Sequence, residues 1–251
     1  MNALRPLIVV AGLVALWQFI VWATGAPPYM LPPPDQVAAA WMERRAVILE
    51  HALFTATEIV LGLLTGALLG CLSALALAYF RPARRWLLPV LVISQAVPVF
   101  ALAPLLVLWL GYGMASKVAM ATLIIYFPVA AAFHDGLRRT DPGWLDLSRT
   151  MDTSRWSMLR HVRVPAALPA LASGLRVATA VAPIGAVVGE WVGSSAGLGY
   201  LMLHANARMQ VDLMFAALAT LGALAVALYF SVDAALRHAM PWQSDSLPEA
   251  D

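Results

Sequence analysis

The segment RTMDTSRWSMLRHVRVP, from Arg149 to Pro165, concentrates positive charge in an otherwise apolar chain. Of the 251 residues, 61% are hydrophobic and 12% are charged, and the mean hydropathy is +0.77. Soluble globular domains are about 45–50% apolar, so this composition predicts a protein that lies in lipid. Six of the sixteen Lys and Arg residues nevertheless fall between positions 138 and 163.

Apolar segments long enough to cross a bilayer occur six times around this basic segment. A helix needs about 20 residues to cross the hydrocarbon layer, and a helix satisfies its own backbone hydrogen bonds there. Prolines predict that the third segment is broken or kinked. The chain is therefore predicted to be an all-α membrane protein with one transmembrane domain, residues 1–251, whose spans lie at about 6–24, 52–80, 87–110, 116–134, 166–190 and 212–236.

The distribution of Lys and Arg predicts how these spans are oriented. With both termini in the cytoplasm, eleven of these residues lie in inner segments and four in outer ones, and short cytoplasmic loops carry the excess in membrane proteins. The largest inner loop is then 135–165. A multi-pass topology follows from this prediction.

Other features exclude whole classes of function. The net charge of +2 gives no reason to expect nucleic-acid binding, and the single cysteine, Cys71, cannot form an internal disulfide. No Cys/His spacing predicts a metal site, and no HExxH pattern predicts a catalytic one. A Gly-Lys-Ser/Thr phosphate loop is also absent, so the chain is not expected to bind ATP or to be an enzyme.

Two explanations of the basic loop remain open from charge alone. It can be a topology signal, or it can be a docking platform made of two short amphipathic helices. Asp141 can cap a helix whose first residue is Pro142, and Trp144, Leu147 and Met151 follow at nearly helical spacing. A turn near residues 152–154 separates it from a second short helix.

The segment DLSRTMDTSRWSMLRHVRVPAALPALASGLRVA, residues 146–178, resembles the EAA loop of permease subunits of ABC importers. Asp146, Leu147 and Ser148 stand at the Glu-Ala-Ala positions of the family pattern, and Asp152 stands at its Gly position. GSSAGLGYLM, residues 193–202, is similar to the branch that imports sulfonates, nitrate, taurine and thiamine precursors. The resemblance covers the chain from about residue 29 to the last span.

The resemblance implies a type I importer (MetI-like) permease fold with a cytoplasmic coupling helix that docks on a separate ATPase subunit. Two ATPase copies would use ATP and Mg, a solute-binding protein would dock on the outer side, and two copies of this chain would form a homodimer. Each arginine of the loop can instead be a solvated topology residue. The residues expected to couple to the ATPase are Asp146, Leu147, Ser148, Arg149, Met151, Asp152, Trp156, Arg160, Pro165 and Pro169.

Two of these positions depart from the family pattern. The usual Glu is Asp146, which is one methylene shorter, and the usual Gly is Asp152, which disfavours a left-handed turn although Asp tolerates one better than most residues do. Pro165 and Pro169 are expected to stop the loop helices and to set the angle of the fifth span.

Glycines in the second span can serve either of two contacts. Gly62, Gly66 and Gly70 recur every four residues, so one helix face can approach a neighbour closely. That neighbour can be another helix of the same chain or the second permease copy.

Ionisable and aromatic residues in the spans are candidates for the substrate path, because charges in membranes are costly. Each can equally be a packing, interface or snorkelling residue. Sequence resemblance favours a thiamine precursor of the hydroxymethylpyrimidine type, with an alkanesulfonate, taurine, nitrate or a riboflavin-like solute as alternatives. The candidates are Glu58, Phe100, Tyr126, Arg176 and Glu190.

Two other classes of function fit the sequence less well than an importer subunit does. An intramembrane enzyme would need a polar catalytic pair, and the sequence indicates none. A channel or transporter that works without an ATPase would leave the basic amphipathic loop without a partner.

Overall fold

The computed structural model describes residues 4–80, 82, 85–86, 89 and 98–242, and this part of the chain is helical without any strand. Short turns and caps separate the helices. The elements are α1 (Leu4–Thr24), α2 (Pro34–Glu43), α3 (Arg45–Tyr79), the 3₁₀ turn η1 (Val99–Leu102), α5 (Ala103–Leu110), α6 (Met114–Arg138), α7 (Pro142–Thr150), α8 (Arg155–Met158), the π-helical turn η2 (Leu159–Arg163), α9 (Val164–Gly193), α10 (Leu198–Ala207) and α11 (Val211–Ala239).

Four helices are long and apolar enough to cross a membrane: α3, α6, the continuous helix Arg155–Gly193, and α11. Ile8–Thr24 and Val99–Leu110 are shorter apolar helices that correspond to the first predicted span and to part of the third. The first part of the predicted third span, residues 87–97, lies mostly outside the described residues. The rest of that span, up to residue 110, is broken as the prolines predict, because η1 follows Pro98 and α5 contains Pro104.

The helix that contains the predicted second span begins before it. Helix α3 starts at Arg45, because no proline or glycine interrupts the chain between Arg45 and Gly62, whereas the span is predicted to begin near residue 52. At 1.5 Å per residue its 35 residues extend about 52 Å, which is well beyond the roughly 30 Å hydrocarbon layer. The short helix α2 precedes α3, with Pro34 as its first residue and Asp35 in its first turn.

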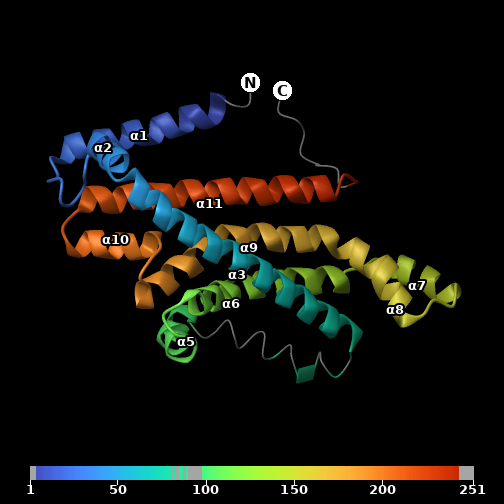
Figure 1. Ribbon diagram of the computed structural model, residues 1–251. Helices are drawn as coiled ribbons and strands as arrows, with labels where there is room; N and C mark the ends of the chain where they lie inside the picture. The colour runs from blue at the N-terminus through green and yellow to red at the C-terminus, as the bar shows by residue number, and fades with distance from the viewer. Residues whose placement is uncertain (1–3, 81, 83–84, 87–88, 90–97, 243–251) are drawn as a thin grey trace.

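Helix α6 lies at the centre of the bundle, packed between α3 and α9. A second apolar cluster joins α2, α10 and α11 through Val37, Leu198 and Leu213. Figure 1 shows α2 and α10 at one end of the molecule and α7 and α8 at the other, with the N-terminal end of α1 and the C-terminal end of α11 directed toward the α7–α8 side.

The glycines of α3 make an internal contact with α6. A Cβ atom on Gly66 would lie 2.7 Å from Ile125 Cγ2, and one on Gly70 would lie 3.0 Å from Val129 Cβ. Gly62 faces Ala121 in the same way. Of the two contacts left open by the sequence, the structure therefore supports packing within one chain.

Replacing Gly66 by alanine is expected to lower the free energy of unfolding by about 1–3 kcal/mol, because the new methyl group would overlap Ile125. Gly222→Ala on α11 is the matched control, since a Cβ there meets nothing within 4 Å. Thermal unfolding of both variants in the same detergent measures the difference. Equal stability of the two variants would contradict the tight α3–α6 contact.

The expectation that Pro165 and Pro169 stop the loop helices is wrong. The chain stays helical from Arg155 to Gly193, with Pro165 in the first turn of α9 and Pro169 inside it. Proline lacks an N–H and its ring crowds the carbonyl four residues earlier. The π-helical turn η2 ends two residues before Pro165 and contains His161, four residues before this proline, so the helix is widened where the crowding would arise.

Candidate functional site

The two short helices α7 and α8 each begin at a residue whose side chain caps the helix N-terminus. Asp141 begins α7 as predicted, because its side chain accepts a hydrogen bond from the Gly143 N–H at 2.6 Å. Ser154 caps α8 by accepting from the Ser157 N–H at 3.2 Å. Between them Asp152 has a φ of 52°, so aspartate makes the left-handed turn that stands at the family's glycine position.

Large apolar side chains are exposed on this end. Met151 is 71% exposed and Leu147 is 62% exposed. Exposed apolar groups that gather at one place mark an interaction site when no lipid covers them. We refer to the group as the tip surface, and it consists of Trp144, Leu147, Met151 and Trp156.

The other residues expected to couple to the ATPase differ in their exposure to solvent and in their contacts. Asp146 and Arg149 are exposed and form an ion pair at 2.7 Å, one helical turn apart, and Arg160 is also exposed. Ser148 is buried and donates to the Trp144 carbonyl at 2.8 Å, so its hydroxyl serves the packing of α7. Pro165 and Pro169 line a pocket of about 600 Å³ together with Trp144.

Arg163 attaches the α7–α8 end to the bundle, a role that the sequence reasoning missed. Its Nε and Nη2 atoms donate to the Leu137 carbonyl at 3.1 and 2.7 Å, at the end of α6. Leu159 is buried beside Leu137 and Phe133, and the Trp156 ring lies edge-on to Tyr79 at 5.7 Å. The tip surface is therefore fixed to both α3 and α6.

A second group of functional candidates is buried near the opposite end, between α3, α6 and α9. We refer to Thr55, Glu58, Lys117 and Glu190 as the outer polar cluster, and each is at most 1% exposed. The sequence reasoning named Glu58 and Glu190 separately, and the structure brings them together. Lys117 is one of the four basic residues that the predicted topology places in outer segments, and in the structure it is buried in α6.

Glu190 organises this cluster by capping α10. Its Oε1 accepts from the Thr55 hydroxyl at 2.6 Å, and its Oε2 accepts from the backbone N–H groups of Gly199 and Tyr200. A carboxylate is favourable at a helix N-terminus because the first N–H groups have no helical partner. Gly197, with a φ of 107°, allows the chain to pass beside this carboxylate, where a Cβ would collide with it.

Lys117 and Glu58 complete the outer polar cluster. The Lys117 ammonium donates to the Tyr112 carbonyl at 2.7 Å and also to the carbonyl of Gly193, the last residue of α9. Glu58 interacts with the charged groups of both Glu190 and Lys117. The cluster thus fastens the α9–α10 turn to α3 and α6.

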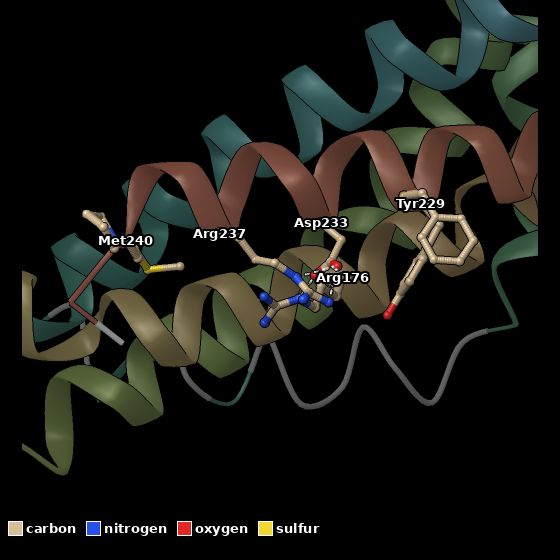
Figure 2. A pocket seen from close by; sticks show the side chains of 7 residues that line it. Arg176, Tyr229, Asp233, Arg237 and Met240 are labelled. Atoms are coloured by element: carbon tan, nitrogen blue, oxygen red, sulfur yellow. Dashed lines mark hydrogen bonds and ion pairs between the residues drawn. The ribbon is translucent and has the colours of Figure 1, made fainter. Parts of the chain in front are cut away.

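The other predicted path residues lie apart from this cluster. Arg176 on α9 pairs with Asp233 on α11 at 2.6 Å, in the pocket that Figure 2 shows. The Tyr126 hydroxyl donates to Ser73 at 2.9 Å between α6 and α3, and Phe100 is exposed on η1. Within one protomer the five residues therefore do not form one site, and their role in transport stays a prediction. In the described part of the chain no group of His, Cys, Asp and Glu side chains has the arrangement of a metal site.

Residues 66–244 match the family model described as binding-protein-dependent transport system inner membrane component. A probable ABC transporter permease protein from Haemophilus influenzae is 57% identical over 232 residues, which cover 92% of this chain and 95% of that protein.

Two relatives have names that include a solute. The formylaminopyrimidine transport permease protein ThiX of Halalkalibacterium halodurans is 33% identical, covering 96% of this chain and 97% of its own length. The riboflavin transport system permease protein RibX of Chloroflexus aurantiacus is 34% identical, covering 92% and 87% respectively.

The fold resembles a chain from an inward-facing structure of the MetNI methionine ABC transporter. The TM-score is 0.68 at 19% identity, and the match covers 78% of this chain and 97% of that one. The all-α, MetI-like fold class predicted from the sequence is therefore confirmed.

Proposed function

The chain belongs to the family of binding-protein-dependent transport system inner membrane components and is a permease subunit of an ABC importer, and from this premise we propose that it carries a thiamine precursor of the hydroxymethylpyrimidine type. The observation that supports this solute is the similarity to a formylaminopyrimidine permease along nearly the whole chain. The riboflavin permease is equally similar, so a riboflavin-like solute is the second candidate. Both solutes contain a flat, nitrogen-rich aromatic ring. Alkanesulfonates, taurine and nitrate rank below them.

In this proposal the tip surface docks on the ATPase subunit, which binds ATP and Mg. Its exposed apolar residues lie on two capped helices that Arg163 and Leu159 hold against the bundle. A rigid apolar projection suits insertion into a groove of a partner, where a few buried side chains supply most of the binding energy. Arg149, Arg155 and Arg160 would face acidic groups around that groove.

The remaining assembly follows from the same proposal. Two permease copies would form a homodimer with two ATPase subunits on the cytoplasmic side, where both termini also lie. A solute-binding protein would dock on the opposite side, at the end that carries α2 and α10. The tip surface and the outer polar cluster are then on opposite sides of the bacterial inner membrane.

Motion of the ATPase subunits would pass through the continuous helix Arg155–Gly193. The tip surface lies at its beginning, and Glu190 and Gly193 lie at its end, where they hold the α9–α10 turn. Packed helices of this kind move as rigid bodies between discrete states rather than deforming continuously. ATP binding would thereby open or close the outer side of the path.

The solute is tested with the permease purified together with its ATPase and binding protein in nanodiscs. Hydroxymethylpyrimidine or formylaminopyrimidine is expected to stimulate ATP hydrolysis severalfold, while riboflavin, taurine, an alkanesulfonate and nitrate are not. Omission of the binding protein is the control. Stimulation by riboflavin alone would replace the thiamine precursor by the second candidate, and uptake without any ATPase would contradict the importer mechanism.

A further inference from the structure

A pocket of about 600 Å³ lies between α9 and α11, on the side of the molecule that carries α7 and α8. Its walls combine charged and apolar side chains, as Figure 2 shows. Arg176 enters from α9, and the others come from α11 and the residue that follows it. The residues that line the pocket include Arg176, Tyr229, Phe230, Asp233, Arg237 and Met240.

Two guanidinium groups share one carboxylate in this pocket. Arg176 Nε donates to Asp233 Oδ1 at 2.6 Å, and Arg237 Nε donates to Asp233 Oδ2 at 2.9 Å. Asp233 is 7% exposed, so the carboxylate is enclosed by its two partners. The three side chains together carry one excess positive charge.

The carboxylate engages only part of the Arg176 guanidinium. Within the described residues, nothing accepts a hydrogen bond from Nη1 or Nη2 of Arg176, while its side chain is 29% exposed. Because Asp233 holds Nε, the two terminal nitrogens are kept in a fixed orientation. A planar pair of N–H donors in this arrangement matches two oxygens of a phosphate group.

The depth of the pocket indicates what can reach it. Asp233 precedes the end of α11 at Ala239 by six residues, which is about 9 Å along the helix axis. Phe230 is 64% exposed beside it, an apolar ring that suits lipid better than water. The pocket therefore has an apolar wall toward the membrane interior and its charged groups toward the membrane surface.

We propose that this pocket binds the phosphate of an anionic phospholipid headgroup, with an acyl chain along Phe230. Basic pockets between transmembrane helices are suited to such headgroups, and a membrane surface rich in acidic lipids supplies them at high local concentration. The leaflet concerned is the one on the α7–α8 side, and describing it as cytoplasmic rests on the orientation proposed above. A transported solute would not require the apolar wall at this depth.

Native mass spectrometry of the full-length permease with its ATPase subunits tests the proposal. Delipidated complex is titrated with phosphatidylglycerol, phosphatidylethanolamine or inorganic phosphate. Wild type is expected to retain phosphatidylglycerol in clear preference to phosphatidylethanolamine, and Arg176→Gln is expected to weaken phosphatidylglycerol binding about tenfold through the loss of charge-assisted hydrogen bonds.

Two further variants keep the test decisive. Arg208→Gln removes an exposed charge at the opposite end and is expected to leave lipid binding unchanged. Arg237→Gln leaves the Arg176–Asp233 pair in place, so it reports on the pocket even where Arg176→Gln folds poorly, and it should also weaken binding. Equal lipid retention by all variants would overturn the proposal. So would displacement of the lipid by inorganic phosphate at matched concentration, which would make free phosphate the ligand.

Discussion

Replacement of Met151 by glutamate is expected to detach the permease from its ATPase subunit and to lower solute uptake at least tenfold. Met151 is 71% exposed on the tip surface, so the change costs the free permease little stability. In the proposed complex the same side chain would be buried, and an unpaired buried carboxylate costs several kcal/mol. Loss of a central interface residue costs about 2 kcal/mol or more, which corresponds to roughly a thirtyfold weaker complex. Co-purification of the ATPase with the tagged permease measures the effect.

Met42→Glu is the matched control for this experiment. Met42 is 63% exposed on α2, at the opposite end of the molecule. Its replacement introduces the same charge, but the ATPase should still co-purify at the wild-type level. If Met151→Glu also retained the ATPase, the tip surface would not be the docking site, and the basic loop would be left as a topology signal.

The second large effect is expected from Glu190→Ala, which should lower the free energy of unfolding by about 3 kcal/mol. The change leaves the N–H groups of Gly199 and Tyr200 without their acceptor in a buried site, while the Thr55 hydroxyl keeps only its longer hydrogen bond to the His51 carbonyl, at 3.2 Å. It also removes one of two facing carboxyl groups, and this relief of repulsion with Glu58 offsets part of the loss. Thermal unfolding of the purified permease measures the change.

Glu58→Gln controls for the mere loss of a buried carboxylate. Glutamine has nearly the same size as glutamate, and the change leaves the hydrogen bonds from Gly199 and Tyr200 to Glu190 in place, so this variant should unfold within about 1 kcal/mol of wild type. Similar destabilisation by Glu58→Gln and Glu190→Ala would show that buried charge, rather than the cap on α10, decides the stability of this region.

Features that depend on local sequence were predicted well. The four longest helices correspond to predicted spans because helix periodicity and hydropathy are read over a short window. The Asp141 cap and the turn at Asp152 depend on neighbouring residues alone, and the structure confirms both. The stop expected at Pro165 was wrong, because a π-helical turn accommodates the proline and the sequence carries no separate signal for such a turn.

The buried polar contacts could not be predicted in the same way. Thr55 and Glu190 are 135 positions apart, and only the packing of α3 against α9 brings them within 2.6 Å. The sequence predicts an outer segment for Lys117 because this lysine lies between two uncharged apolar segments. The signal that could have corrected this was the nearby pair of span carboxylates, Glu58 and Glu190, since a buried cation needs such partners.

The continuous helix from Arg155 to Gly193 works mechanically as an articulated lever. Its 39 residues extend about 58 Å. Pro169 and Pro183 each remove one backbone hydrogen bond, so the helix can bend at both, and Pro183 lies ten residues before its end. The long arm carries the tip surface, and the short arm of about 15 Å ends in the residues that hold α10. In the proposed importer, a push delivered at the long arm would therefore reach the far side of the membrane in part as a change in the angle of the short arm.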